Sequence, residues 1–164
     1  MNYLGLNQEQ VANTGKSLNQ LLADYQLYYQ NLRNFHWNIS GENFFDLHEK
    51  FEELYEDARL KIDEIAERLL TLRLRPMSTS SAYLESAKIE EAGKVTDSHL
   101  MVKTILENHK ILIADMRTVI NRAGEVKDEG TIDMIGGFLS GMEKKSWMLD
   151  AWNTRSKKSL PAEV

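Results

Sequence analysis

A helical pattern dominates the start of the chain and is clearest in residues 18–35, LNQLLADYQLYYQNLRNF. Apolar and aromatic side chains recur there at intervals of three and four residues, at Leu18, Leu21, Leu22, Tyr25, Tyr28, Tyr29, Leu32 and Phe35. This spacing places them on one face of an α-helix. Because the pattern extends over about residues 8–37, the sequence predicts a long amphipathic helix there.

Three further segments carry the same pattern. The first covers about residues 44–74. The second begins after the capping candidates Thr96 and Asp97 and ends near Gly124, and the third runs from about Thr131 to Trp152. The loops 38–43 and 124–130 are short and predict antiparallel neighbours, whereas residues 75–95 are long enough to run the length of a bundle and to include a short helix near 82–88. One long crossover is the ferritin-like arrangement, so we expect an all-α, ferritin-like four-helix bundle.

The composition limits the other possibilities. A chain of 164 residues suits a single domain, 1–164, with a short C-terminal tail at 156–164. The absence of cysteine excludes disulfides and thiolate metal sites. Residues 1–10 show no signal-peptide pattern, and no stretch approaches the roughly 20 apolar residues of a membrane span. We therefore expect a cytoplasmic protein, and its net charge of −5 gives it no overall attraction to nucleic acid or membrane.

A group of histidines and acids marks the candidate site. His36 ends the first predicted helix, and the second carries the side chains His48, Glu52, Asp63 and Glu67. At 100° per residue, the three acids fall about 40°, 60° and 100° from His48, on one flank and away from the apolar stripe. Because Glu52 and Asp63 are about 16 Å apart along the helix, one metal ion cannot bind both within one chain.

Two half-sites follow from this separation. His36, His48 and Glu52 form one, and Asp63 and Glu67 form the other. A two-fold axis beside this flank would bring each half-site against the other half-site of a partner chain, so an isologous dimer would hold two complete sites. Imidazole and carboxylate ligands suit iron or zinc, with manganese as a further candidate. The alternative is a solvated acidic face, which is the commoner meaning of acids at helical spacing.

The surrounding residues resemble the signature of the Dps family of miniferritins. They are the stretches NFHWNISG (34–41), FDLHEKF (45–51) and DEIAER (63–68). The family pattern is His, eleven residues, His, three residues, Asp, ten residues, Asp, three residues, Glu. This chain matches every spacing and every residue type except at Glu52, where the family usually has Asp. Arg73 and Leu74 stand where the family usually has two glycines, so we expect the second helix to continue about a turn further here.

The resemblance implies a ligand set and an activity. The ligands would be His36, His48, Glu52, Asp63 and Glu67, at a dimer interface inside a twelve-subunit shell. Each inter-subunit site would take two ferrous ions, which hydrogen peroxide, or more slowly dioxygen, would oxidise before the ferric product is stored as mineral. This ferroxidase activity would protect against oxidative stress.

The other candidate residues carry less specific signals. Trp37 follows the first ligand and is a family feature, either as an electron donor to the site or as an aromatic that fills the interface. The acids around the start of the last helix correspond to the family's iron-entry pore, although a helix N-terminus favours acids by its dipole alone. They are Glu125, Asp128, Glu129 and Asp133. His99 and His109 are interpreted as structural or solvated.

Two further hypotheses remain open. In the first, the main role of the chain is to coat and protect DNA as a nucleoid protein. In the second, the chain is a metal-free bundle that acts through its surface. DNA binding is predicted to be weak or absent, because Glu9 is the only charged side chain before Lys16 and the tail has a net charge of only about +1.

Overall fold

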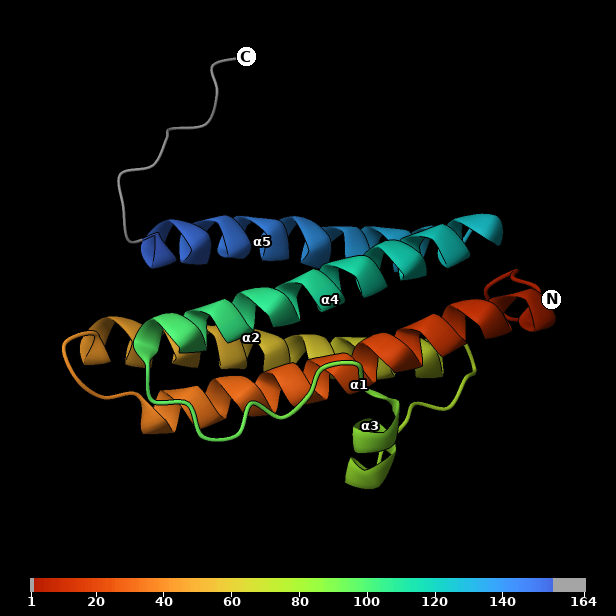
Figure 1. Cartoon of the computed structure of the whole chain (residues 1–164). Coiled ribbons are helices and arrows are strands. Elements are labelled where there is room, and N and C mark those ends of the chain that lie inside the picture. Colours follow the sequence, from red (N-terminus) through yellow and green to blue (C-terminus); the bar gives the residue numbers. More distant parts are fainter. Residues whose placement is uncertain (1, 155–164) are drawn as a thin grey trace, which may run out of the picture.

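The computed structural model describes residues 2–154, which contain five α-helices and no strand (Figure 1). The helices are α1 (Gln8–Asn38), α2 (Phe44–Thr71), α3 (Ser80–Ser86), α4 (Ser98–Glu125) and α5 (Glu129–Asn153). Helices α1 and α2 run antiparallel, as do α4 and α5, whereas α2 and α4 run in the same direction (Figure 1). The prediction of a ferritin-like bundle with one long crossover that includes a short helix is confirmed.

The apolar stripes of the four long helices meet in one buried core. Leu18, Leu21 and Leu32 of α1 are fully buried, and the rings of Phe35 and Phe51 join α1 to α2 with their centroids 5.8 Å apart. Burying each such side chain contributes about 1.5–3 kcal/mol. Among residues 2–154, none of the helices combines the length and the apolar character that a membrane span requires.

The crossover is fixed to the bundle by polar side chains of α1. The buried carboxylate of Asp24 accepts hydrogen bonds from the backbone N–H groups of Lys88 and Ile89, at 2.7 and 2.8 Å. About two turns further along α1, the Asn31 amide donates to the Glu90 carbonyl and accepts from the Ala92 N–H, both at 2.9 Å. These contacts guide the returning chain along α1, so α4 begins at the same end of the bundle as α2 (Figure 1).

The end of α2 differs from the prediction. The helix stops at Thr71 and does not continue through Leu74, because Arg73 adopts the left-handed conformation with φ 58°. The N–H of Leu74 then donates to the Leu69 carbonyl, and that of Arg73 to the Leu70 carbonyl, at 2.8 and 2.9 Å. This is the Schellman C-cap that glycine usually makes. The arginine therefore adopts the left-handed conformation that glycine usually provides at a helix C-terminus, and the helix is not extended.

Replacing Arg73 by glycine should stabilise the protein. The left-handed conformation costs a residue with a side chain about 1 kcal/mol, and glycine adopts it without that cost. Arg73→Ala is the control, because it keeps the strain and removes the guanidinium, which lies 4.6 Å from the centre of the Tyr3 ring. We expect the unfolding midpoint in denaturant to rise for Arg73→Gly relative to Arg73→Ala. Equal midpoints would contradict the strain at this residue.

Candidate functional site: paired histidines on the flank of the bundle

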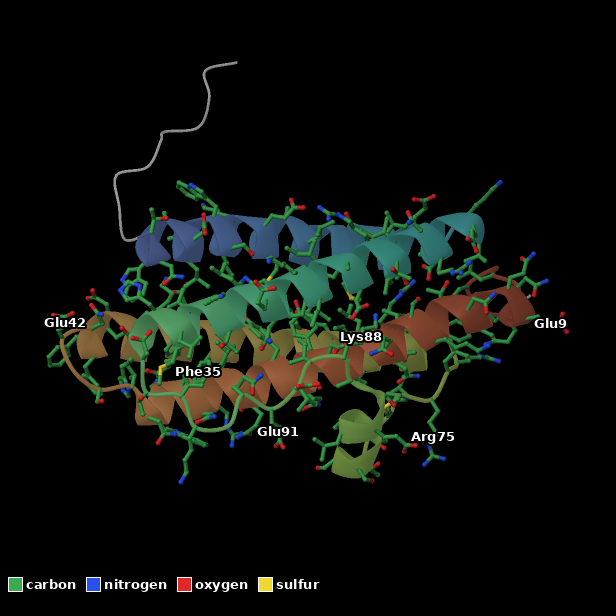
Figure 2. All side chains as sticks on the ribbon, in the orientation of Figure 1. Glu9, Phe35, Glu42, Arg75, Lys88 and Glu91 are labelled. Carbon is green, nitrogen blue, oxygen red and sulfur yellow. The ribbon has the colours of Figure 1, made fainter. Side chains whose placement is uncertain are left out.

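Half-site one lies at the end of the bundle where the α1–α2 loop joins the two helices, near the labelled Phe35 and Glu42 (Figure 2). The imidazoles of His36 and His48 are stacked there, with ring centroids 3.9 Å apart and planes 19° from parallel. Each ring also contacts the other residue's backbone. His36 Nδ1 lies 2.7 Å from the His48 carbonyl oxygen, and His48 Nδ1 lies 2.9 Å from the His36 carbonyl oxygen.

These reciprocal hydrogen bonds determine the chemistry of both rings. A carbonyl oxygen only accepts, so Nδ1 must carry the proton in each histidine. In the neutral imidazole the Nε2 lone pair is then free to bind a metal ion. Backbone carbonyls that hold Nδ1–H are a common outer contact of metal-binding histidines, since they fix the orientation of the ring. These contacts therefore assign His36 and His48 the tautomer that leaves Nε2 available to a metal ion.

Tyr55 of α2 contacts the His36 ring, and Glu52 lies three residues before Tyr55 on the same helix. Glu52 is exposed, and its Oε1 accepts a long hydrogen bond of 3.4 Å from the Tyr55 hydroxyl. The Tyr55 ring meets the His36 ring edge-on, with centroids 5.3 Å apart. Desolvation, followed by the charges of Glu52 and Glu56, raises the pKa of the Tyr55 phenol, so the hydroxyl remains a donor. Tyr55 was not among the predicted site residues, although its place one turn after Glu52 was a visible signal.

Half-site two remains separate in the single chain. Asp63 and Glu67 are exposed on α2, further from the α1–α2 loop than Glu52. Within residues 2–154, no three histidine or acidic side chains lie close enough together to hold a metal ion. One chain thus pairs the two histidines, but it brings neither Glu52 nor Asp63 and Glu67 close enough to complete a group of three ligands with them. A site that uses all five residues requires a second copy of the chain.

The interior of the bundle has a different character. The half-buried carboxylate of Asp57 accepts from Lys61 and from Lys145 of α5, both at 2.5 Å. Burial opposes ionisation of Asp57, but these two ammonium groups hold its pKa below the ordinary value. Carboxylates from facing helices form the metal site of many four-helix bundles, whereas two ammonium groups here repel a cation. The exposed flank is therefore the better place for a metal ion.

This interior cluster was not predicted from the sequence, because acids at helical spacing such as Asp57 usually belong to a solvated face. Lys61 offered a signal, since it falls only about 70° from the centre of the apolar stripe of α2. The interpretation of His109 as structural is confirmed. Its ring is buried between the Tyr28 hydroxyl at 2.9 Å from Nε2 and the Ser146 hydroxyl at 2.8 Å from Nδ1. His99 contacts Asn153 through Nδ1 at 2.8 Å.

Trp37 points away from the packed core and is 61% exposed. The Arg33 guanidinium lies over its ring at 4.8 Å, and over the Tyr29 ring at 5.0 Å. The indole is therefore accessible at the surface of the single chain. Its role as an electron donor stays a prediction.

The structure divides the four acids assigned to an iron-entry pore. Glu125, Glu129 and Asp133 are exposed around the α4–α5 turn, where the prediction remains open. Asp128 was wrongly included, because its carboxylate is only 2% exposed and caps α5 by accepting from the Thr131 N–H at 3.1 Å. It also forms an ion pair with Arg68 of α2 at 2.5 Å. A buried carboxylate that is already bonded is not available to line a channel.

Asp128→Ala should therefore reduce stability. It removes the helix cap and leaves the mostly buried Arg68 guanidinium without its partner, at a cost of about 3 kcal/mol. Glu129→Gln and Asp133→Asn should each change the free energy of unfolding by less than about 0.5 kcal/mol, as is usual at exposed positions. Denaturant unfolding of the three variants checks this order. If Asp128→Ala left the free energy of unfolding unchanged, the ion pair would contribute nothing to stability, and Asp128 would again be a candidate pore residue.

Comparison with known proteins agrees with this architecture. The family model for a ferritin-like domain matches residues 15–158. A "DNA protection during starvation protein" of Porphyromonas gingivalis is 46% identical over 151 residues, which cover 92% of this chain and 95% of the relative. A protein of the same name from Brevibacillus brevis is 42% identical over 135 residues, which cover 82% of this chain and 91% of the relative.

Solved structures show the same relationship. The Dps protein of Vibrio cholerae O1, described as a member of the ferritin-like diiron-carboxylate superfamily, has a TM-score of 0.92 and 44% identity, with 94% of this chain and 97% of that chain covered. The Dps protein of Bacillus brevis has a TM-score of 0.87 and 38% identity, with 91% and 100% covered. With the paired histidines and the separate acids on α2, these similarities identify the chain as a ferritin-like protein of the Dps family.

Proposed function

We propose that this protein oxidises ferrous iron with hydrogen peroxide, or more slowly with dioxygen, and stores the ferric product. Two ferrous ions bind as substrate at each inter-subunit site, between His36, His48 and Glu52 of one subunit and Asp63 and Glu67 of its partner. The subunits form a hollow homo-oligomer, a dodecamer built from dimers, of about 230 kDa from twelve chains of 18.9 kDa. The protein acts in the cytoplasm and protects the cell against oxidative stress.

The observation that carries this proposal is the pair of reciprocal imidazole–carbonyl hydrogen bonds. They assign the proton of each ring to Nδ1 and so leave each Nε2 lone pair able to bind metal, on two stacked rings that Tyr55 connects to the exposed carboxylate of Glu52. The described chain cannot complete a metal site alone, and the missing carboxylates are available on the same flank of another copy. Nitrogen and oxygen ligands suit ferrous iron, and also zinc or manganese as substitutes.

The chemistry requires little from the protein beyond holding two ions together. One hydrogen peroxide takes two electrons, one from each ferrous ion, and with two protons it becomes two molecules of water. Because both electrons arrive at one site, no hydroxyl radical is released. The fixed imidazoles and carboxylates determine where the ions bind, and the iron supplies the electrons.

The test is an anaerobic titration followed by peroxide. Ferrous ions are added to the intact oligomer until binding saturates, and peroxide is then added while the ferric absorbance is recorded. We expect two ferrous ions per site and one peroxide consumed per two ions, with no hydroxyl radical detected by spin trapping. Saturation without any acceleration over free iron would reject a ferroxidase and favour a bundle that acts only through its surface.

A nucleoid protein that coats DNA is the second candidate, and the names of the Porphyromonas gingivalis and Brevibacillus brevis relatives favour it. The charge of this chain opposes it, since twelve subunits of −5 give a shell of about −60, which repels a polyanion. The tail residues that would have to bind phosphate, Arg155, Lys157 and Lys158, lie outside the described residues.

Plasmid DNA should therefore migrate unchanged in a gel when it is mixed with micromolar shell at about 150 mM salt. Divalent metals are chelated, because a bridging metal ion would retard DNA without any basic contact. A variant that ends at Arg155 is the matched control. It lacks Lys157 and Lys158, so twelve tails can no longer bind one duplex together through these residues. Clear retardation by the full chain, abolished in the shortened variant, would contradict the prediction and assign DNA binding to the tail.

A further inference from the structure

We infer that Tyr55 is a positioning residue of half-site one, which holds Glu52 and His36 in a fixed relation to each other. The inference rests on the proposed function, because it concerns how that half-site receives metal. The Tyr55 side chain contacts both Glu52 and His36, through its hydroxyl to Glu52 Oε1 and through a T-shaped contact between its ring and the His36 ring. It contacts no metal itself in this assignment and acts through these two ligands.

The need for such a residue follows from Glu52. Glutamate has one more methylene than the aspartate that the Dps pattern carries here, and it has one more rotatable bond to immobilise when it binds metal. Glu52 is exposed, so the core does not restrict it. Residues three apart on a helix are neighbours on its surface, and Tyr55 is the third residue after Glu52. Its hydroxyl thus selects one orientation of the longer carboxylate.

The tyrosine is suited to this role because its own ring is held from two directions. The His36 ring and the Tyr29 ring both meet it edge-on, with centroids at 5.3 and 6.0 Å and interplanar angles of 80° and 81°. Such edge-to-face contacts each favour one arrangement of the rings. His36 is in turn fixed by its hydrogen bond to the His48 carbonyl. Glu52, Tyr55, His36 and His48 therefore form one connected unit.

The length of the hydrogen bond makes the inference specific to glutamate. At 3.4 Å, the contact between the Tyr55 hydroxyl and Glu52 Oε1 is already near the limit for a hydrogen bond. Aspartate is one methylene shorter, so its carboxylate lies closer to the α2 backbone and no longer reaches a hydroxyl that Glu52 itself contacts only at 3.4 Å. Glu52→Asp should consequently abolish the influence of Tyr55 while retaining a carboxylate ligand.

The experiment is a double-mutant cycle with cobalt(II) as the probe, in the assembled protein without oxidant. Tyr55→Phe removes the hydroxyl and keeps the ring contacts. Tyr29→Phe is the matched control, since the Tyr29 hydroxyl contacts Arg33 Nη1 at 3.4 Å and neither histidine. Cobalt affinity and the visible absorption band of the bound ion are measured for the wild type, Tyr55→Phe, Glu52→Asp, the double variant and Tyr29→Phe.

We expect Tyr55→Phe to weaken cobalt binding about tenfold and to shift the absorption band, as loss of an outer contact of a ligand typically does. Tyr29→Phe should match the wild type. In the Glu52→Asp background, Tyr55→Phe should change the affinity by less than about twofold, because the interaction it removes is already absent. Unchanged binding in Tyr55→Phe, or an equal loss in the Glu52→Asp background, would overturn the role of Tyr55.

His36→Ala separates this outcome from a failure of the site itself. If His36→Ala weakens cobalt binding and Tyr55→Phe does not, the metal site stands and Tyr55 has no positioning role. If neither variant changes the cobalt affinity or spectrum, cobalt binds elsewhere and the proposed site is wrong together with the role of Tyr55.

Discussion

We expect oligomers made only of His36→Ala or only of Asp63→Ala to oxidise iron at least about 100-fold more slowly than the wild type, and mixed oligomers of the two to recover about a quarter of the lost rate. The loss follows because each variant removes a direct ligand from every site, which costs at least as much as losing an outer contact. The recovery follows from the two half-sites. In the proposed dimer, each site takes half-site one from one subunit and half-site two from its partner.

The fraction recovered is set by random pairing. A site is intact only if its half-site one comes from an Asp63→Ala chain and its half-site two from a His36→Ala chain. In an equal mixture each condition is met half of the time, so about one quarter of all sites are intact. A mixture of His36→Ala with His48→Ala is the matched control, because both changes lie in half-site one and no pairing repairs them.

Mixed assembly is verified by native mass spectrometry before the rate is measured. A mixture that recovers no more than the control would show that the five residues do not divide between two subunits as proposed. If Asp63→Ala alone oxidised iron at the wild-type rate, Asp63 would not be a ligand.

The second large effect concerns acid stability and His109. Burial, followed by the charges of Lys145 and Lys61, lowers the pKa of His109 to about 3 in the folded protein. The unfolded chain binds a proton at this residue below about pH 6.5. The folded form therefore loses stability as the pH falls from about 6.5, by up to roughly 1.4 kcal/mol per pH unit, until His109 protonates in the folded state as well.

His109→Gln removes this proton uptake and retains a polar side chain. We expect the variant to lose less stability than the wild type between about pH 6.5 and pH 4, with the difference growing to roughly 2–3 kcal/mol over that interval. Unfolding midpoints measured against pH, at one protein concentration, check the result. Parallel pH profiles for the two proteins would contradict a neutral, buried His109.

Asp115 should change stability with pH in the direction opposite to His109. It therefore provides a control for the sign of the pH dependence. Burial, together with the nearby Asp24, raises the pKa of Asp115 to about 6 even though Lys88 contacts it. The folded protein then binds this proton before the unfolded chain does, so stability increases as the pH falls from about 6 toward 4. Asp115→Asn should remove that gain. The free energy of unfolding of the variant should therefore fall more steeply with acid than that of the wild type.

Much of the fold could be predicted from the sequence because helical periodicity and capping are local properties. The start of α4 illustrates this, since Asp97 caps it by accepting from the Leu100 N–H at 2.7 Å. The end of α2 could not be predicted in the same way. The pattern of side chains continues through Leu74, but Arg73 adopts a positive φ, and Leu74 turns back to within reach of Gly15 on α1. Tertiary packing ended the helix there.

The candidate site divides along the same line. Spacing alone placed His36, His48 and Glu52 at one end of the flank and Asp63 further along, since helix geometry converts residue number into distance. The reciprocal bonds between the histidines and the contacts of Tyr55 depend on how α1 and α2 face each other. Asp128 shows the converse, because nothing in the sequence distinguishes a carboxylate that binds Arg68 of another helix from one that faces solvent.

The most direct measurement is anomalous diffraction from crystals of the protein loaded anaerobically with ferrous iron or zinc. We expect metal density between two subunits, bound by His36, His48 and Glu52 of one chain and by Asp63 and Glu67 of the other. Metal held within a single bundle beside Asp57 and His109, or absent from the flank of α2, would contradict a site shared between subunits.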